Sequence, residues 1–230
     1  MKFIRTSELV KLSGNVFDSL STPLRDFFWK EISLKDNRLK EAVKEERYEE
    51  AAQIRDEYEE KAAYLADRLA SDIEEEIDQL GVPYRFENIS ATGLAVNGYC
   101  VINKDVLKSH PAVMMFVIFH ELAHHYQYGK HGKDFAESIY TNDISKIDSD
   151  VEKLVWIENV ADKMAQNKTN YYIKKYDLGY PLITGKGKSD KGELKSHVLR
   201  MKQMVLNMPP EKRNIHDINE ALYNFIKVSE

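Results

Sequence analysis

Residues 112–124 read AVMMFVIFHELAH, a long apolar run that passes directly into two histidines and a glutamate. Pro111 precedes the run, and proline is favoured in the first turn of a helix. We therefore expect a helix from residue 111 to about residue 128, which Gly129 would end. The apolar run predicts that this helix is buried.

The two histidines have the spacing of a metal site. His120 and His124 are four residues apart, so on a helix both imidazoles project from one face and can reach the same ion. Glu121 lies about 100° further round the helix, near enough to reach a water molecule on that ion. This is the His-Glu-x-x-His pattern, in which the histidines bind zinc and the glutamate is the base. His125 points away from the pair, so we expect it to be structural or to face solvent.

A catalytic zinc needs a third protein ligand and an open position for water. Glu158 is one candidate, because it lies on the next strongly periodic helix, expected over residues 150–166. Asp162 follows one turn later and could accept the second ring N–H of a ligand histidine. The residues around them predict a buried helix, where an unpaired carboxylate would be costly. His131, just past Gly129, is the alternative third ligand.

Short segments ahead of this helix have the pattern of β-strands. They are residues 84–87, then 93–98 and 99–103, and the Asn97-Gly98 pair is typical of a two-residue hairpin turn. We expect a small antiparallel sheet over the metal-binding helix, in an α+β fold. The strand over residues 99–103 is a plausible edge on which a substrate could add a strand.

The first 80 residues predict a helical region. Thr22-Pro23 is a plausible cap and first turn, and residues 35–80 contain neither proline nor glycine before the stop at 81–83. We therefore divide the chain into a helical region, residues 1–80, and a catalytic domain with C-terminal helices, residues 81–230.

Composition excludes several classes of protein. A net charge of −5 over 230 residues gives no global basic bias toward nucleic acid. The single cysteine, Cys100, cannot form an internal disulfide, which favours a reducing compartment. The longest apolar run, residues 112–119, is too short to span a bilayer, and the first residues do not have the pattern of a secretory signal. We expect a cytoplasmic protein without a membrane partner.

The motifs His120-Glu121-x-x-His124 and Glu158-x-x-Ala161-Asp162 resemble the gluzincin pattern of thermolysin-like enzymes. With the preceding strand, they resemble the ImmA/IrrE family of small bacterial and phage metallopeptidases over roughly residues 85–166. Ala123 stands where that family usually carries glycine. The resemblance implies a zincin-like metallopeptidase domain and a zinc-dependent endopeptidase acting on a protein or peptide substrate. Glu121 would be the general base on zinc-bound water.

Peptide hydrolysis also needs a donor that stabilises the oxyanion. Four side chains in the C-terminal half are candidates, and the sequence does not choose among Tyr171, Tyr172, His197 and His216.

Residues 131–135, HGKDF, resemble the segment with which SprT-like peptidases supply their third ligand. This implies an alternative function, a protease acting on DNA-associated proteins, in which the lysines between residues 174 and 202 would contact phosphate. A non-catalytic zinc-binding interaction protein is a further alternative. Glu121 argues against it, because a structural zinc site gains nothing from a base.

Residues 39–57 resemble the UvrB/UvrC (UVR) motif, a short helical hairpin used for protein–protein contacts. The match is closest over residues 48–56, YEEAAQIRD. Each half of the segment carries only a thin apolar stripe, which needs a partner. We therefore predict a hairpin over about residues 35–62 that packs on itself, on the catalytic domain or on another protein.

Overall fold

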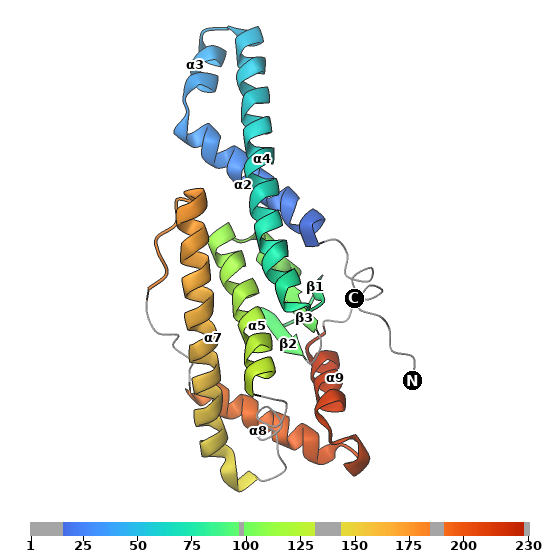
Figure 1. The fold of residues 1–230 in the computed structure, drawn as a ribbon. Helices are drawn as coiled ribbons and strands as arrows, with labels where there is room; N and C mark the ends of the chain where they lie inside the picture. Colours follow the sequence, from blue (N-terminus) through green and yellow to red (C-terminus); the bar gives the residue numbers. More distant parts are fainter. Residues whose placement is uncertain (1–15, 97–98, 132–143, 185–190, 228–230) are drawn as a thin grey trace.

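The computed structural model describes residues 16–96, 99–131, 144–184 and 191–227 (Figure 1). These ranges are mostly helical with one three-stranded sheet, which agrees with the predicted α+β class. The helices are α2 (Val16–Lys35), α3 (Arg38–Lys44), α4 (Tyr48–Leu80), α5 (Pro111–His131), α7 (Ile147–Tyr176), α8 (Lys191–Asn207) and α9 (Ile215–Ile226). The strands are β1 (Tyr84–Glu87), β2 (Gly93–Val96) and β3 (Tyr99–Asn103). No helix in these ranges is long and apolar enough to cross a bilayer.

Helix α2 is already formed at Val16, and Pro23 lies inside it, so the prediction that Thr22-Pro23 opens a helix is wrong. Leu20, Leu24 and Phe28 recur at one-turn spacing, and all three are buried. Burying such side chains contributes roughly 1.5–3 kcal/mol each. Together they outweigh the cost of about 3 kcal/mol for a proline inside a helix.

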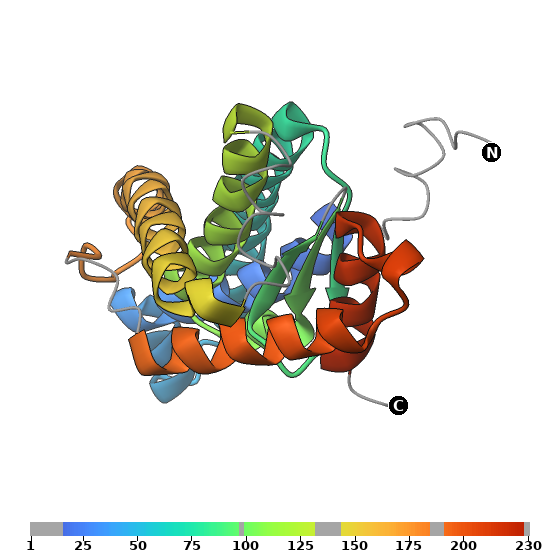
Figure 2. The same ribbon diagram turned by 90° about the horizontal axis from the view of Figure 1, so that it is seen from below.

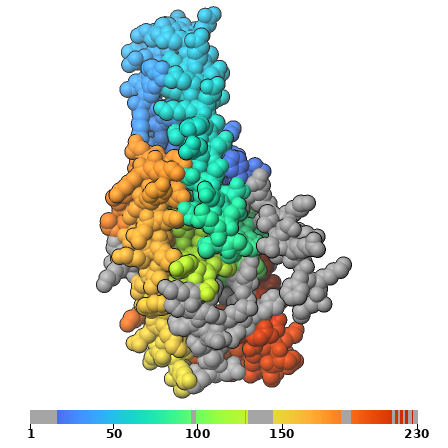
Figure 3. Space-filling model, in the orientation of Figure 1, coloured from blue at the N-terminus to red at the C-terminus, as the bar shows by residue number. Residues whose placement is uncertain are grey.

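The first turns of α4 pair with α3 in a hairpin that projects from the rest of the molecule (Figures 1 and 3). Its small core joins residues of both arms to Trp29 and Ile32 of α2: Ala42, Ala51, Ile54 and Tyr58. The hairpin therefore packs on itself and on α2, while Val43 and Tyr48 are exposed on it. Binding of a partner protein there stays a prediction.

Helix α4 ends where the sequence predicts, because Gly81 adopts the left-handed backbone of a helix C-cap, with φ 62°. Beyond the hairpin, α4 shares one hydrophobic core with α2, α5 and the sheet. The division of the chain at residue 80 stays a prediction.

The sheet is mixed, with strand order β1-β3-β2. β2 pairs antiparallel with β3, but β1 pairs parallel with it, so the prediction of an antiparallel sheet is wrong for β1. β3 is the central strand of the sheet, so the prediction that residues 99–103 form an edge strand is also wrong. Residues 88–92 carry the chain two strand spacings, about 10 Å, which five residues can reach. β3 then returns into the gap, where Cys100, Val101 and Ile102 are fully buried.

Helix α5 begins at Pro111 as predicted but continues to His131. Gly129 does not end it, since the left-handed backbone of a glycine C-cap is absent there. Helix α7 is longer than the predicted 150–166 and runs antiparallel beside α5 (Figure 1). Seen from below, α8 crosses under α7 and the sheet (Figure 2). The structure therefore places α5 between α7 on one side and β2 on the other.

Candidate metal site

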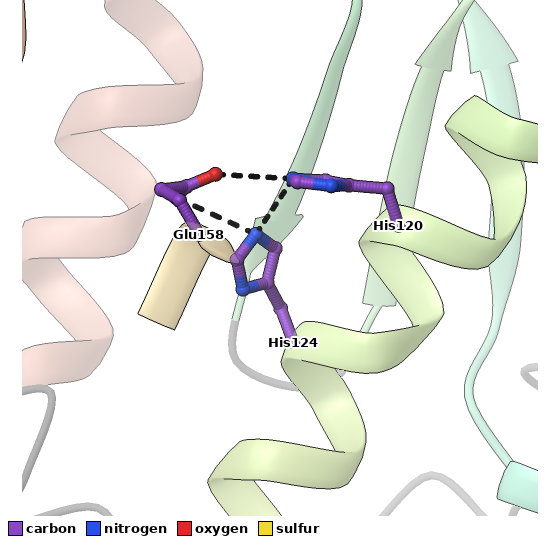
Figure 4. Close-up of side chains that lie close together, drawn as sticks. All are labelled: His120, His124 and Glu158. Atoms are coloured by element: carbon purple, nitrogen blue, oxygen red, sulfur yellow. Dashed lines mark hydrogen bonds and ion pairs between the residues drawn. The ribbon is translucent and has the colours of Figure 1, made fainter. Parts of the chain in front are cut away.

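Three side chains from two helices converge beside the sheet. His120 and His124 project from α5 toward Glu158 on α7 (Figure 4). The two imidazole Nε2 atoms are 3.1 Å apart. The Glu158 carboxylate lies 3.1 Å from Nε2 of His120 and 3.6 Å from Nε2 of His124. The sequence predicted this set, and the antiparallel packing of α5 and α7 brings its members together.

The donor set and its spacing fit a zinc ion. Zinc at catalytic sites is commonly held by two imidazole nitrogens and one carboxylate oxygen. Four ligand atoms placed tetrahedrally at bond lengths of about 2.0–2.2 Å lie roughly 3.3–3.5 Å from one another. The two Nε2 atoms are 3.1 Å apart, Oε2 of Glu158 lies 3.1 Å from Nε2 of His120, and Oε1 of Glu158 lies 3.6 Å from Nε2 of His124, all close to that range. The three side chains can therefore hold such an ion with only small adjustments.

Both ring Nδ1 atoms have an acceptor beside them, which leaves the Nε2 atoms for a metal. Nδ1 of His120 lies 2.9 Å from the Asp162 carboxylate, at ion-pair distance but without the alignment of a hydrogen bond. Nδ1 of His124 lies 3.0 Å from the amide oxygen of Gln127. The Gln127 amide nitrogen donates to the backbone carbonyl of Ile157, at 2.9 Å. That carbonyl can only accept, so the Gln127 oxygen must face His124 and fixes its tautomer.

The site is electrostatically coupled. Burial lowers the pKa of His120, but the carboxylates of Asp162 and Glu158 overcome this and raise that pKa to about 10. For Glu158, burial favours the neutral acid, yet hydrogen bonds from His120 and His124 hold its pKa well below the usual range. The negative charge of Glu158 thus favours the protonated imidazoles of His120 and His124, whereas burial alone would favour the neutral rings.

Glu121 lies on the side of α5 that faces the sheet. It is buried, and this burial raises the pKa of its carboxyl group. The charges of His124 and His120 and a hydrogen bond from the backbone amide of Ala95 oppose that rise. The backbone of Gly93 also lies directly against the Glu121 side chain. A carboxylate in such a position can accept a proton from a group that approaches the metal site.

Two further histidines, His125 and His131, follow the ligand pair in the sequence. His125 is partly buried, and its Nε2 lies 3.2 Å from the carbonyl oxygen of Tyr99. Burial lowers the pKa of His125 to about 4, so the neutral ring donates to that carbonyl and ties α5 to β3. His131 is the last residue of α5, and its side chain lies outside the described part of the structure. Residues 132–135 of the SprT-like segment also lie outside it.

The candidates for an oxyanion donor separate in the structure. Tyr171 is exposed, and the hydroxyl of Tyr172 donates to Glu76, 3.0 Å away. His197, on α8, is partly buried, and burial and the charge of Arg200 lower its pKa, while the Glu158 carboxylate opposes that fall. The side chain of His216 lies outside the described residues.

Three site residues were missed by sequence reasoning: Gln127, Gly93 and Ala95. Gln127 follows His124 by three residues, a spacing at which side chains on a helix can meet. Gly93 is a glycine inside a predicted strand, which often marks a close approach by another group. The role of Ala95 depends on its backbone amide, so its side chain carries no signal.

No family model matches the chain, and comparisons with curated proteins and with solved structures likewise give no match.

Proposed function

We propose that the chain is a zinc-dependent endopeptidase that hydrolyses peptide bonds of a protein substrate, built on a zincin-like metallopeptidase fold. One observation carries the proposal. His120, His124 and Glu158 each present a ligand atom within 4.8 Å of the others, beside the buried carboxylate of Glu121. A structural zinc site is usually closed by four protein ligands, whereas three ligands and a nearby base are typical of hydrolysis.

Each side chain of the site has a separate role in the proposed reaction. A zinc ion held by the three ligands would lower the pKa of a water molecule toward about 7 and polarise the scissile carbonyl. Glu121 would accept the proton of the attacking water and pass it to the leaving amide nitrogen. Asp162 and Gln127 would keep the ligand imidazoles in the orientation that presents Nε2.

The position of the sheet supports an extended substrate. β2 is an edge strand, and it lies next to α5 and Glu121. A peptide added along its outer edge would pass the base and the metal ligands. The role that the sequence assigned to residues 99–103 thus moves to β2, because β3 already has partners on both sides.

The alternative of a protease acting on DNA-associated proteins needs free cations. In the described part of the chain, Lys175 and Lys195 each lie 2.6 Å from an aspartate carboxylate. Lys202 is fully buried against Asp150. Lys175 and Lys202 are thus less available to phosphate, whose contacts require accessible cations, whereas Lys174, Lys191 and Lys195 are exposed. A non-catalytic zinc-binding protein stays a second alternative. A measurement of peptide hydrolysis distinguishes it from the proposed protease.

The test is the variant Glu121→Gln, with Glu152→Gln on the exposed face of α7 as its matched control. Zinc content is measured on each purified protein, and hydrolysis of casein is followed with and without a chelator. We expect E121Q to bind one zinc ion but to lose about 10²–10⁴-fold in hydrolysis, since that is the usual contribution of a general base. E152Q should keep both properties. Full activity of E121Q would exclude this role, and zinc binding without hydrolysis by the unmodified chain would favour the non-catalytic alternative.

A further inference from the structure

The Glu121 side chain rests against the edge strand β2. Glu121 is only 8% exposed, and the backbone of Gly93 on β2 lies directly against it. The Glu121 side chain therefore packs against β2.

At Gly93 the contact leaves no room for a side chain. A Cβ atom at this position would lie 2.6 Å from Oε1, 2.8 Å from Cγ and 2.9 Å from Cδ of Glu121. Carbon atoms in favourable contact are about 3.5–4.0 Å apart. Because Cγ is among the crowded atoms, rotation of the terminal carboxylate alone would not relieve the clash. Either the Glu121 side chain or the strand would have to move.

We propose that Gly93 is a positioning residue for the catalytic base, because the space it leaves lets the Glu121 side chain pack against β2. This inference rests on the proposed function for the role of Glu121 as base, but the contact itself does not. All three atoms nearest to the added Cβ belong to Glu121 and none to a metal ligand. A side chain at position 93 should therefore impair the chemical step and leave zinc binding intact.

The experiment is a double-mutant cycle with Gly93→Ala and Glu121→Ala, in the full chain. Gly129→Ala is the matched control, because it makes the same substitution on α5 where the added Cβ meets nothing within 4 Å. Thermal unfolding midpoints are measured for the wild type, both single variants, the double variant and the control. Zinc affinity and the kcat and KM for peptide hydrolysis are measured for the wild type, G93A and G129A.

We expect G93A to lower the midpoint in the wild-type background but not in E121A, where the clashing atoms are gone. G93A should lower kcat on the order of 100-fold, as expected for a displacement of about 1 Å, with KM and zinc affinity within a few-fold of the wild type. G129A should leave all of these readouts near wild type or raise the midpoint.

An equal fall in the midpoint in both backgrounds would overturn the inference, because Gly93 would then serve the sheet and not Glu121. Unchanged kcat in G93A would overturn it as well. If the wild type binds zinc but hydrolyses nothing, the proposed function is wrong. The double-mutant cycle measured by thermal unfolding then still shows whether Gly93 makes the space in which the Glu121 side chain packs.

Discussion

The amide oxygen of Gln127 lies 3.0 Å from Nδ1 of His124, one helical turn away on α5. Gln127 is itself held by its hydrogen bond to the carbonyl of Ile157 on α7. The orientation of one imidazole of the site thus depends on the contact between the two helices. Partners of this kind keep a ligand histidine in a single tautomer and ring position.

Replacement of Gln127 by alanine should weaken zinc binding about 10–100-fold, the usual effect of removing a group that orients a metal ligand. Competition with a chromophoric chelator measures this. Gln53→Ala, at an exposed position on α4, is the control and should bind zinc like the wild type. An unchanged affinity in Q127A would show that α5 alone fixes the His124 ring.

The third ligand is decided by a matched pair of variants, Glu158→Ala and His131→Ala. We expect E158A to lose zinc binding and H131A to keep it, because Glu158 already lies 3.1 Å from Nε2 of His120. Zinc that binds the folded state raises its stability, by about 2.7 kcal/mol at a free concentration 100 times Kd. The rise of the unfolding midpoint with added zinc should therefore disappear in E158A. The opposite pattern would assign the third ligand to His131.

The fully buried pair of Lys202 and Asp150 joins α8 to α7, with the Lys202 Nζ 2.6 Å from the carboxylate. Removing one partner of a buried pair typically costs about 3–5 kcal/mol, because it leaves an uncompensated charge. Lys202→Ala should fall at the low end, since Lys153 still lies 3.2 Å from Asp150. Lys195 lies on α8 like Lys202, and Lys195→Ala removes an exposed ion pair with Asp148 of α7. This substitution should cost no more than about 1 kcal/mol. Urea unfolding distinguishes the two, and equal costs would contradict this account.

The base of the hairpin carries a pH-dependent contact. Hydrogen bonds from the Arg38 side chain and backbone amide lower the pKa of Asp36 to about 2. A pKa depressed by folding means that the contact stabilises above the ordinary value of 3.8 and is lost as pH falls toward 2. The carboxyl carbon of Asp36 should titrate near pH 2 by NMR. In Arg38→Gln the midpoint should rise toward 3.8, and a midpoint already near 3.8 in the wild type would show that the contact does not persist in solution.

Local patterns were sufficient for much of the fold. The apolar run after Pro111 predicted a buried helix, and Gly81 marked the end of α4 at the correct residue. Where local signals failed, packing had overridden them. Pro23 does not open a helix, because the buried Leu20, Leu24 and Phe28 keep α2 intact across it.

The sequence by itself determined the pair of imidazoles one helical turn apart with a glutamate beside them, because the helical repeat alone sets that geometry. Only the tertiary structure decided what surrounds the pair. The packing of α7 on α5 brings Glu158 to the imidazoles and locks Gln127, and the central place of β3 leaves β2 at the edge against Glu121. These contacts join residues far apart in the chain through distances and backbone directions, which no local spacing in the sequence encodes.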